Sequence, residues 1–137
     1  MTSPTLVRVL AISGSLRAKS INTAVLLTAQ SLAPADLTVT IYLGLGALPH
    51  FNPDLDTTTP PATDVALRAA VDSADALLIC APEYAHGVPG TLKNALDWLV
   101  SYPSFFNKPR HHQCPARRGL RSSFPPRNSR SHECPLD

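Results

Sequence analysis

Short polar side chains and one arginine gather in the segment Ser13–Asn22, between an apolar run and a helical pattern. Gly14 lets the backbone come close to a ligand, and Arg17 offers a planar pair of donors that suits phosphate oxygens. The first N–H groups of a helix have no internal partner and favour negative charge. The segment therefore predicts an anion site, and the alternative is an ordinary strand-to-helix turn with a solvated arginine. Its short side-chain donors are Ser13, Ser15, Ser20 and Asn22.

A second chemically rich segment runs from Pro82 to Trp98. His86 could act as an acid, but a solvent-facing histidine is the simpler interpretation. For Trp98, which follows a buried helical stripe, we favour packing over ligand stacking. Cys80 lies in an apolar strand, where a thiol is typically an inert core residue.

The elements that carry these segments alternate between strands and helices. Apolar runs predict buried strands, 3.6-residue periods predict helices, and Pro and Gly mark the loops. We predict strands over 6–12, 37–43 and 76–81, a surface loop over 44–61, and helices that start at Ile21, at a capping Asp64 and at Pro89.

This order predicts an α/β fold with a doubly wound parallel sheet and right-handed crossovers. Ligands of such sheets bind beyond the carboxyl ends of the strands, where the strand order reverses. The loops after the first and third strands therefore face each other across one crevice, and they are the two chemically richest loops of the chain.

The residues Gly14-Ser15-Leu16-Arg17 and the run from Pro82 to Trp98 together resemble the NADPH-dependent FMN reductase family. The resemblance covers about Val7 to Lys108. It implies a flavodoxin-like fold with strand order 2-1-3-4-5 and an oxidoreductase that passes electrons from NADPH through FMN to a small acceptor such as a quinone. It also implies a homodimer or homotetramer.

By this resemblance, the first loop holds the FMN phosphate and the second lines the isoalloxazine edge, largely with backbone groups. The chemistry then belongs to the cofactor, so no residue is required as a nucleophile or general base. The family commonly has Asn at the position of Ala85 and often Ser at that of Gly87. The implied cofactor-binding residues are Ser13, Gly14, Ser15, Arg17, Ser20, Asn22, Pro82, Glu83, Tyr84, Ala85, His86 and Gly87.

The composition of the chain indicates which broad class of protein it belongs to. The chain has 137 residues, 44% of them hydrophobic, which suits one globular domain. No apolar stretch reaches the roughly 18 residues of a membrane span, and no signal peptide is evident. Three cysteines fit a reducing compartment, so we expect a cytoplasmic protein with no membrane partner.

Residues 110–137 differ in composition from residues 1–109, which form the expected N-terminal part of the FMN-binding domain. They hold six Arg, no Lys and few apolar residues, and we expect a disordered tail, with only three βα units before it. A zinc site from His111, His112, Cys114, His132 and Cys134 matches no compact finger spacing. A basic arm that binds nucleic acid lacks interleaved aromatic residues.

The tail also fits a shift of reading frame. The codons for Arg-His-His-Gln-Cys, read one base later, allow Val-Ile-Ile-Asn-Ala, which suits a fourth parallel strand. The nucleotide sequence tests this hypothesis. Two further functions remain open: a non-catalytic flavodoxin-like remnant, and a binding module that uses its basic tail.

Overall fold

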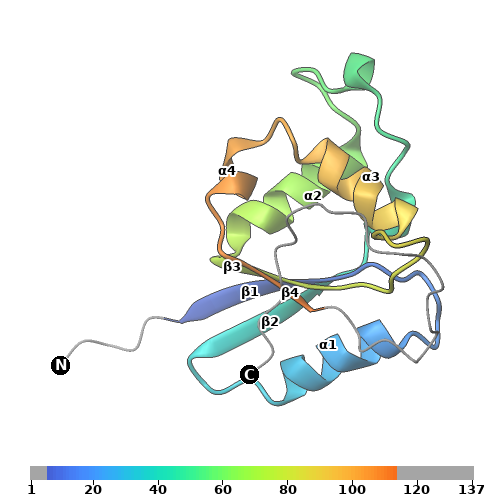
Figure 1. Ribbon diagram of the computed structural model, residues 1–137. Helices are drawn as coiled ribbons and strands as arrows, with labels where there is room; N and C mark the ends of the chain where they lie inside the picture. The colour runs from blue at the N-terminus through green and yellow to red at the C-terminus, as the bar shows by residue number, and fades with distance from the viewer. Residues whose placement is uncertain (1–5, 114–137) are drawn as a thin grey trace, which may run out of the picture.

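A four-stranded parallel sheet forms the centre of the computed structural model, which describes residues 6–113 (Figure 1). The strand order is β2-β1-β3-β4, in agreement with the first four positions of the expected order. All three strand pairs are parallel, which confirms the predicted doubly wound α/β fold. The strands are β1 Val7–Ser13, β2 Leu37–Tyr42, β3 Ala76–Cys80 and β4 Arg110–Gln113.

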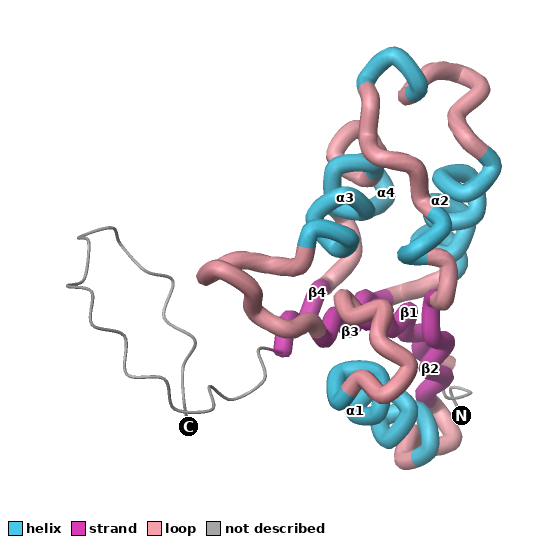
Figure 2. Tube along the Cα trace, turned by 90° about the vertical axis from the view of Figure 1, so that its right-hand side faces the viewer, coloured by secondary structure: helices cyan, strands magenta, loops and turns pink. Residues whose placement is uncertain are grey.

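The helices lie on both faces of this sheet. Figure 2 shows α1 on one face and α2, α3 and α4 on the other. The larger core lies under α2 and α3, where Leu67, Val71 and Leu92 pack on strand residues such as Leu10 and Ile79. The helices are α1 Ile21–Ser31, α2 Ala62–Ser73, α3 Gly90–Trp98 and α4 Pro103–Phe106, with 3-10 turns η1 Leu45–Ala47 and η2 Pro53–Leu55. Within residues 6–113, no helix is long and apolar enough to span a membrane.

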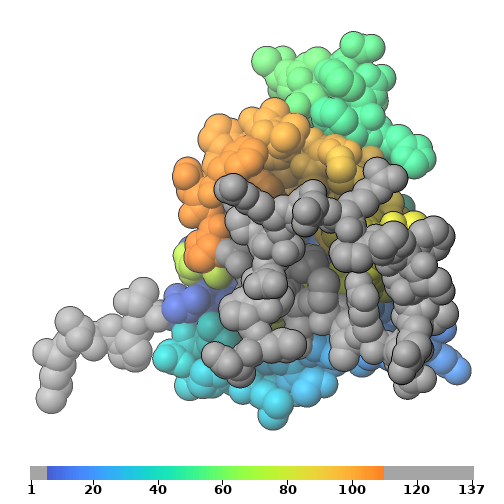
Figure 3. All heavy atoms as spheres, viewed as in Figure 1, coloured from blue at the N-terminus to red at the C-terminus, as the bar shows by residue number. Residues whose placement is uncertain are grey.

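The loop over residues 44–61 was expected at the surface, and part of it projects as a lobe beyond the helices (green in Figure 3), but Leu45 and Leu48 are buried in the larger core. Hydrogen bonds with helix α3 hold the middle of this loop against the domain. Trp98 Nε1 and Asn94 Nδ2 each donate a hydrogen bond to the carbonyl oxygen of Pro49, both at 2.9 Å. Phe51 N donates to Asn94 Oδ1 at 2.7 Å. The predicted packing role of Trp98 is confirmed, because its side chain is fully buried.

Strand β4 corrects the expectation that regular structure stops after three βα units. Its residues pair with β3 in register from Leu77↔Arg110 to Cys80↔Gln113, and Leu77 N donates to Pro109 O at 3.0 Å. A ladder uses backbone groups, which every residue except proline supplies in full, so a polar stretch can extend a sheet. Strand β3 therefore lies between β1 and β4. Residues 114–137 lie outside the described residues, and with them the rest of the expected tail and the zinc candidates Cys114, His132 and Cys134.

The sequence predicted that Asp64 caps its helix, and this prediction is wrong. Helix α2 begins earlier, at Ala62 after Pro61, so Asp64 falls in the first turn. Its side chain is fully buried, and Oδ2 lies 2.8 Å from Arg68 Nε. Burial raises the pKa of the Asp64 carboxyl because it disfavours the charged form, while the guanidinium of Arg68 opposes this effect.

Three carboxylates, Asp56, Asp72 and Asp75, accept hydrogen bonds from residues of other segments, and their lowered pKa values predict how the stability of the fold changes in acid. The pKa of Asp75 is lowered to about 2 by hydrogen bonds from the side chain and backbone N–H of Arg8, which join β1 to the turn before β3. Hydrogen bonds from Ser101 and Arg68 lower the pKa of Asp56, and one from Tyr102 lowers that of Asp72.

A carboxyl whose folded pKa lies below its unfolded value stabilises the fold at higher pH, and this stability is lost as the pH falls through the folded value. We therefore expect the urea midpoint to fall between about pH 4 and pH 2. Asp75→Asn should flatten this decline, because the variant has no carboxyl to protonate. An unchanged pH profile in that variant would contradict the assignment.

Candidate functional site

The two chemically rich loops leave the sheet side by side, at the carboxyl ends of β1 and β3. Ser13 and Cys80 are register partners, and Gly14 N continues the ladder by donating to Cys80 O at 2.9 Å. A Cβ on Gly14 would lie 2.6 Å from the Cβ of Ala81, closer than two carbon atoms can approach. Glycine at this position lets the two loops pack against each other at one edge of the sheet.

Hydroxyl groups hold the first loop in shape. Ser13 Oγ lies 2.9 Å from Thr23 Oγ1, and Ser20 Oγ caps α1 by accepting from Thr23 N at 3.4 Å. Ser15 Oγ accepts from Arg17 N at 3.4 Å. Thr23, which no sequence pattern had singled out, contacts both Ser13 and Ser20. Its position three residues after the cap Ser20 is the signal that could have identified it.

Backbone donors remain available around this loop. Among the residues that the structure describes, the N–H groups of Leu16, Ala18, Lys19 and Ile21 have no acceptor. The side chain of Arg17 is exposed and has no carboxylate partner in the same part of the chain. Free N–H groups at the start of a helix, next to an unpaired guanidinium, form a cradle suited to a phosphate group.

Asn22, an expected contact of the phosphate, is the second residue of α1. Its side chain is buried, and Oδ1 accepts a hydrogen bond from Cys80 Sγ at 3.2 Å. This contact joins α1 to β3 beneath the loop. Asn22 therefore supports the cradle from below with this oxygen, while Cys80 lies buried in the strand, as expected of a core thiol.

The second loop contains a tight turn over Tyr84–Gly87. Tyr84 N donates to Gly87 O and Gly87 N donates to Tyr84 O, both at 3.0 Å. The two central residues, Ala85 and His86, have φ angles of 50° and 60°. His86 Nδ1 lies 3.3 Å from Glu83 Oε1, and both side chains are exposed, which agrees with a solvent-facing histidine. Pro82 directly follows Ala81, which contacts the first loop.

The left-handed conformation of Ala85 predicts that glycine is more stable there. A Cβ in this region costs about 1–2 kcal/mol, and the greater chain entropy of glycine offsets about half of this. We expect Ala85→Gly to raise the free energy of unfolding by about 0.5–1 kcal/mol, measured by urea denaturation.

The matched control is Ala69→Gly at an exposed position within α2. This second substitution should lower the free energy of unfolding by about 1 kcal/mol, because glycine weakens a helix interior. If both variants lost stability to the same extent, the conformation assigned to Ala85 would be wrong.

Comparison with known proteins gives one consistent result. Residues 7–111 match the family model of the NADPH-dependent FMN reductases. A probable NADPH:quinone oxidoreductase 2 from Oryza sativa is 43% identical over 101 residues. An NAD(P)H-dependent FMN reductase from Pseudomonas aeruginosa is 37% identical over 105 residues.

A solved structure shows the same arrangement. The flavoenzyme NAD(P)H:(acceptor) oxidoreductase FerB from Paracoccus denitrificans superposes with a TM-score of 0.70 at 34% identity, over 78% of this chain and 59% of FerB.

The sequence alignments with the Oryza and Pseudomonas proteins cover 71% and 75% of this chain, but only 49% of the Oryza protein and 56% of the Pseudomonas protein. The chain thus spans about half the length of the curated relatives that it matches.

Proposed function

Because the chain belongs to the NADPH-dependent FMN reductase family, we propose that it binds FMN and passes electrons from NADPH to a quinone-type acceptor. The observation that carries this proposal is the packing of Gly14 against Ala81, which brings an anion cradle and a tight backbone turn to one edge of the sheet. The names of the relatives support a quinone-type acceptor, since one of them is an NADPH:quinone oxidoreductase.

The first loop would hold the FMN phosphate. The free N–H groups between Leu16 and Ile21 point to an anion at the start of α1, and Arg17 adds a charge-assisted pair of donors. Ser15 and Ser20 would add hydroxyl donors. Ser13 and Asn22 would keep the loop in shape, because their side chains are already bonded to Thr23 and Cys80.

The second loop would line the edge of the flavin ring. The backbone of Pro82, Glu83 and Tyr84 follows the contact between Ala81 and Gly14, so it leaves the sheet beside the phosphate cradle. The turn at Ala85 and His86 fixes the direction of these backbone groups. Bound FMN would supply the redox chemistry, by accepting a hydride from NADPH and reducing the acceptor. The protein would supply position and the exclusion of water.

A titration of the 137-residue chain with FMN, followed by the fluorescence of the flavin, tests the proposal. We expect saturable binding of one FMN per chain and consumption of NADPH that depends on both FMN and benzoquinone. A folded chain that binds no FMN would contradict the proposal.

A second function is a flavodoxin-like domain that binds FMN without turnover. The coverage favours it, because the aligned residues make up only 49% and 56% of the two relatives whose names describe the reductase activity. Saturable FMN binding without consumption of NADPH would identify this function. The basic arm, the homo-oligomer of the family and the cytoplasmic location stay predictions from the sequence.

A further inference from the structure

Two side-chain hydrogen bonds join the first turn of α1 to the carboxyl ends of β1 and β3. Ser13 Oγ lies 2.9 Å from Thr23 Oγ1, and Cys80 Sγ donates to Asn22 Oδ1 at 3.2 Å. Ser13 and Cys80 are register partners, so the two bonds lie side by side beneath the phosphate cradle. The second bond ends on an amide, whose oxygen accepts hydrogen bonds and whose nitrogen donates them. The direction of this amide therefore decides what it offers to an anion.

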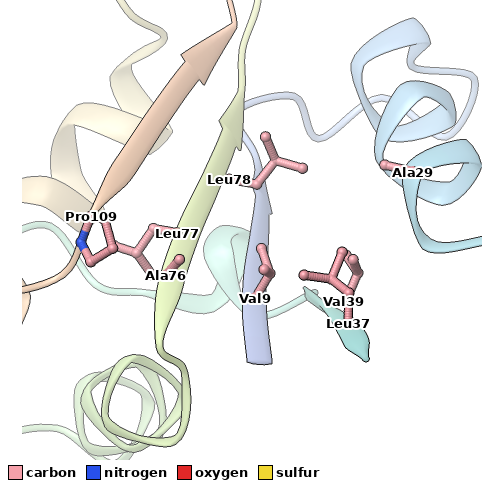
Figure 4. A pocket seen from close by; sticks show the side chains of 8 residues that line it. All are labelled: Val9, Ala29, Leu37, Val39, Ala76, Leu77, Leu78 and Pro109. Carbon is pink, nitrogen blue, oxygen red and sulfur yellow. The ribbon is translucent and has the colours of Figure 1, made fainter. Parts of the chain in front are cut away.

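The thiol of Cys80 is the hydrogen-bonding side chain that β3 presents to α1. Ala76, Leu78 and Cys80 share this face of the strand, because side chains alternate along it. Figure 4 shows Ala76 and Leu78 in the wall of an apolar groove between α1 and Pro109, and the described residues that line this groove include no charged side chain. On this face, the described part of β3 therefore offers the Asn22 amide no polar side-chain partner other than Cys80.

The bond from Cys80 determines which end of the Asn22 amide is left for the cradle. The thiol is directed at Oδ1, so Nδ2 points away from Cys80. Nδ2 has no acceptor among the described residues, yet it is not one of their fully buried unpaired atoms, so it reaches the surface. The side chain as a whole is only 8% exposed. Because helical side chains lean toward the N-terminus of their helix, this buried amide presents its donor end on the side of the cradle.

We propose that Cys80 is a positioning residue, whose thiol holds the Asn22 amide with Nδ2 toward the phosphate of FMN. This inference rests on the proposed function. The oxygen of the amide then shapes the loop, while its nitrogen donates to the anion. Without the thiol, the amide can turn over and present Oδ1, whose partial negative charge repels a phosphate oxygen. Cys80 itself touches neither cofactor nor acceptor, so its effect is confined to the preference for FMN over riboflavin, which lacks the phosphate.

Fluorescence titration of the 137-residue chain with FMN and with riboflavin gives the ratio of the two affinities. Cys80→Ala should lower this preference for FMN by about 3- to 10-fold, the effect of one hydrogen bond, with riboflavin affinity unchanged. Cys80→Ser keeps a donor at the same position and should retain most of the preference. In an Asn22→Ala background, Cys80→Ala should have no further effect, because no amide remains to be oriented.

The matched control is Val39→Ala, which truncates another residue of the buried cluster under α1 and removes no donor. It should lower the melting temperature and leave the preference for FMN unchanged. Circular dichroism establishes that each variant is folded, and Cys80→Val replaces Cys80→Ala if the latter does not fold.

Three results would overturn this inference and leave the proposed function intact: an unchanged preference in Cys80→Ala, an equal loss in Cys80→Ser, or an equal loss in the Asn22→Ala background. A folded chain that binds no FMN would overturn both.

Discussion

Replacing Trp98 with alanine is expected to lower the free energy of unfolding by about 3–5 kcal/mol, the largest effect on stability that we predict. The side chain is fully buried in the larger core, and its ring meets that of Phe51 edge to face, with 5.2 Å between centroids. Its Nε1 also holds the loop over residues 44–61 through Pro49. A loss of this size is a large part of the 5–15 kcal/mol that typically holds a domain together. Urea denaturation measures it.

Trp98→Phe separates the two contributions of this residue. Phenylalanine keeps an aromatic ring but cannot donate to Pro49 O, so we expect a smaller loss, about 1–2 kcal/mol. Proteolysis within residues 44–61 should rise in both variants, because the loop loses one of its two bonds to Pro49. If Trp98→Ala lost less than about 1 kcal/mol, the core would not depend on this side chain as the structure indicates.

Replacing Arg17 with alanine is expected to weaken FMN binding by about 10- to 100-fold. This estimate corresponds to the loss of hydrogen bonds between a guanidinium and a phosphate. The folded state should be unaffected, because the side chain is exposed and has no partner among the described residues. Fluorescence titration gives the two dissociation constants.

Two controls identify the phosphate as the group that Arg17 contacts. Riboflavin has the same ring system without the phosphate, so its affinity should be equal in the variant and the unchanged chain. Arg8→Ala removes the same charge at the opposite end of β1, where Arg8 pairs with Asp75, and it should leave FMN affinity unchanged. An equal loss of affinity for riboflavin would place Arg17 beside the ring instead.

The order of elements could be predicted because each depends on a local pattern. The apolar run before Ser13 and the repeat after Ile21 mark a strand and a helix wherever they occur in a chain. Parallel pairing then brings the ends of β1 and β3 to one edge, so the meeting of the two loops also followed from the sequence. In the structure, the two loops meet where Gly14 lies against Ala81.

Other features depend on contacts that no local pattern contains. The hydrogen bond that Asn22 Oδ1 accepts from Cys80 joins two residues that are distant in sequence. Asp64 resembled a cap, yet its carboxylate is buried beside Arg68 in the first turn. Strand β4 was missed because its residues have the composition of a loop, while the exposed edge of β3 offers backbone partners to any segment beside it.

The central place of β1 in the sheet has a consequence for synthesis of the chain on the ribosome. Leu10 pairs with Thr40 on one side and with Leu77 on the other, so β1 gains its second partner late. At about 5–20 residues per second, roughly 3–13 s separate the synthesis of Leu10 from that of Leu77. During this time one edge of an apolar strand is open, and neighbouring ribosomes on the same messenger carry the same open edge. Slow codons between Tyr42 and Cys80 would therefore lower the yield of folded protein by favouring pairing between nascent chains.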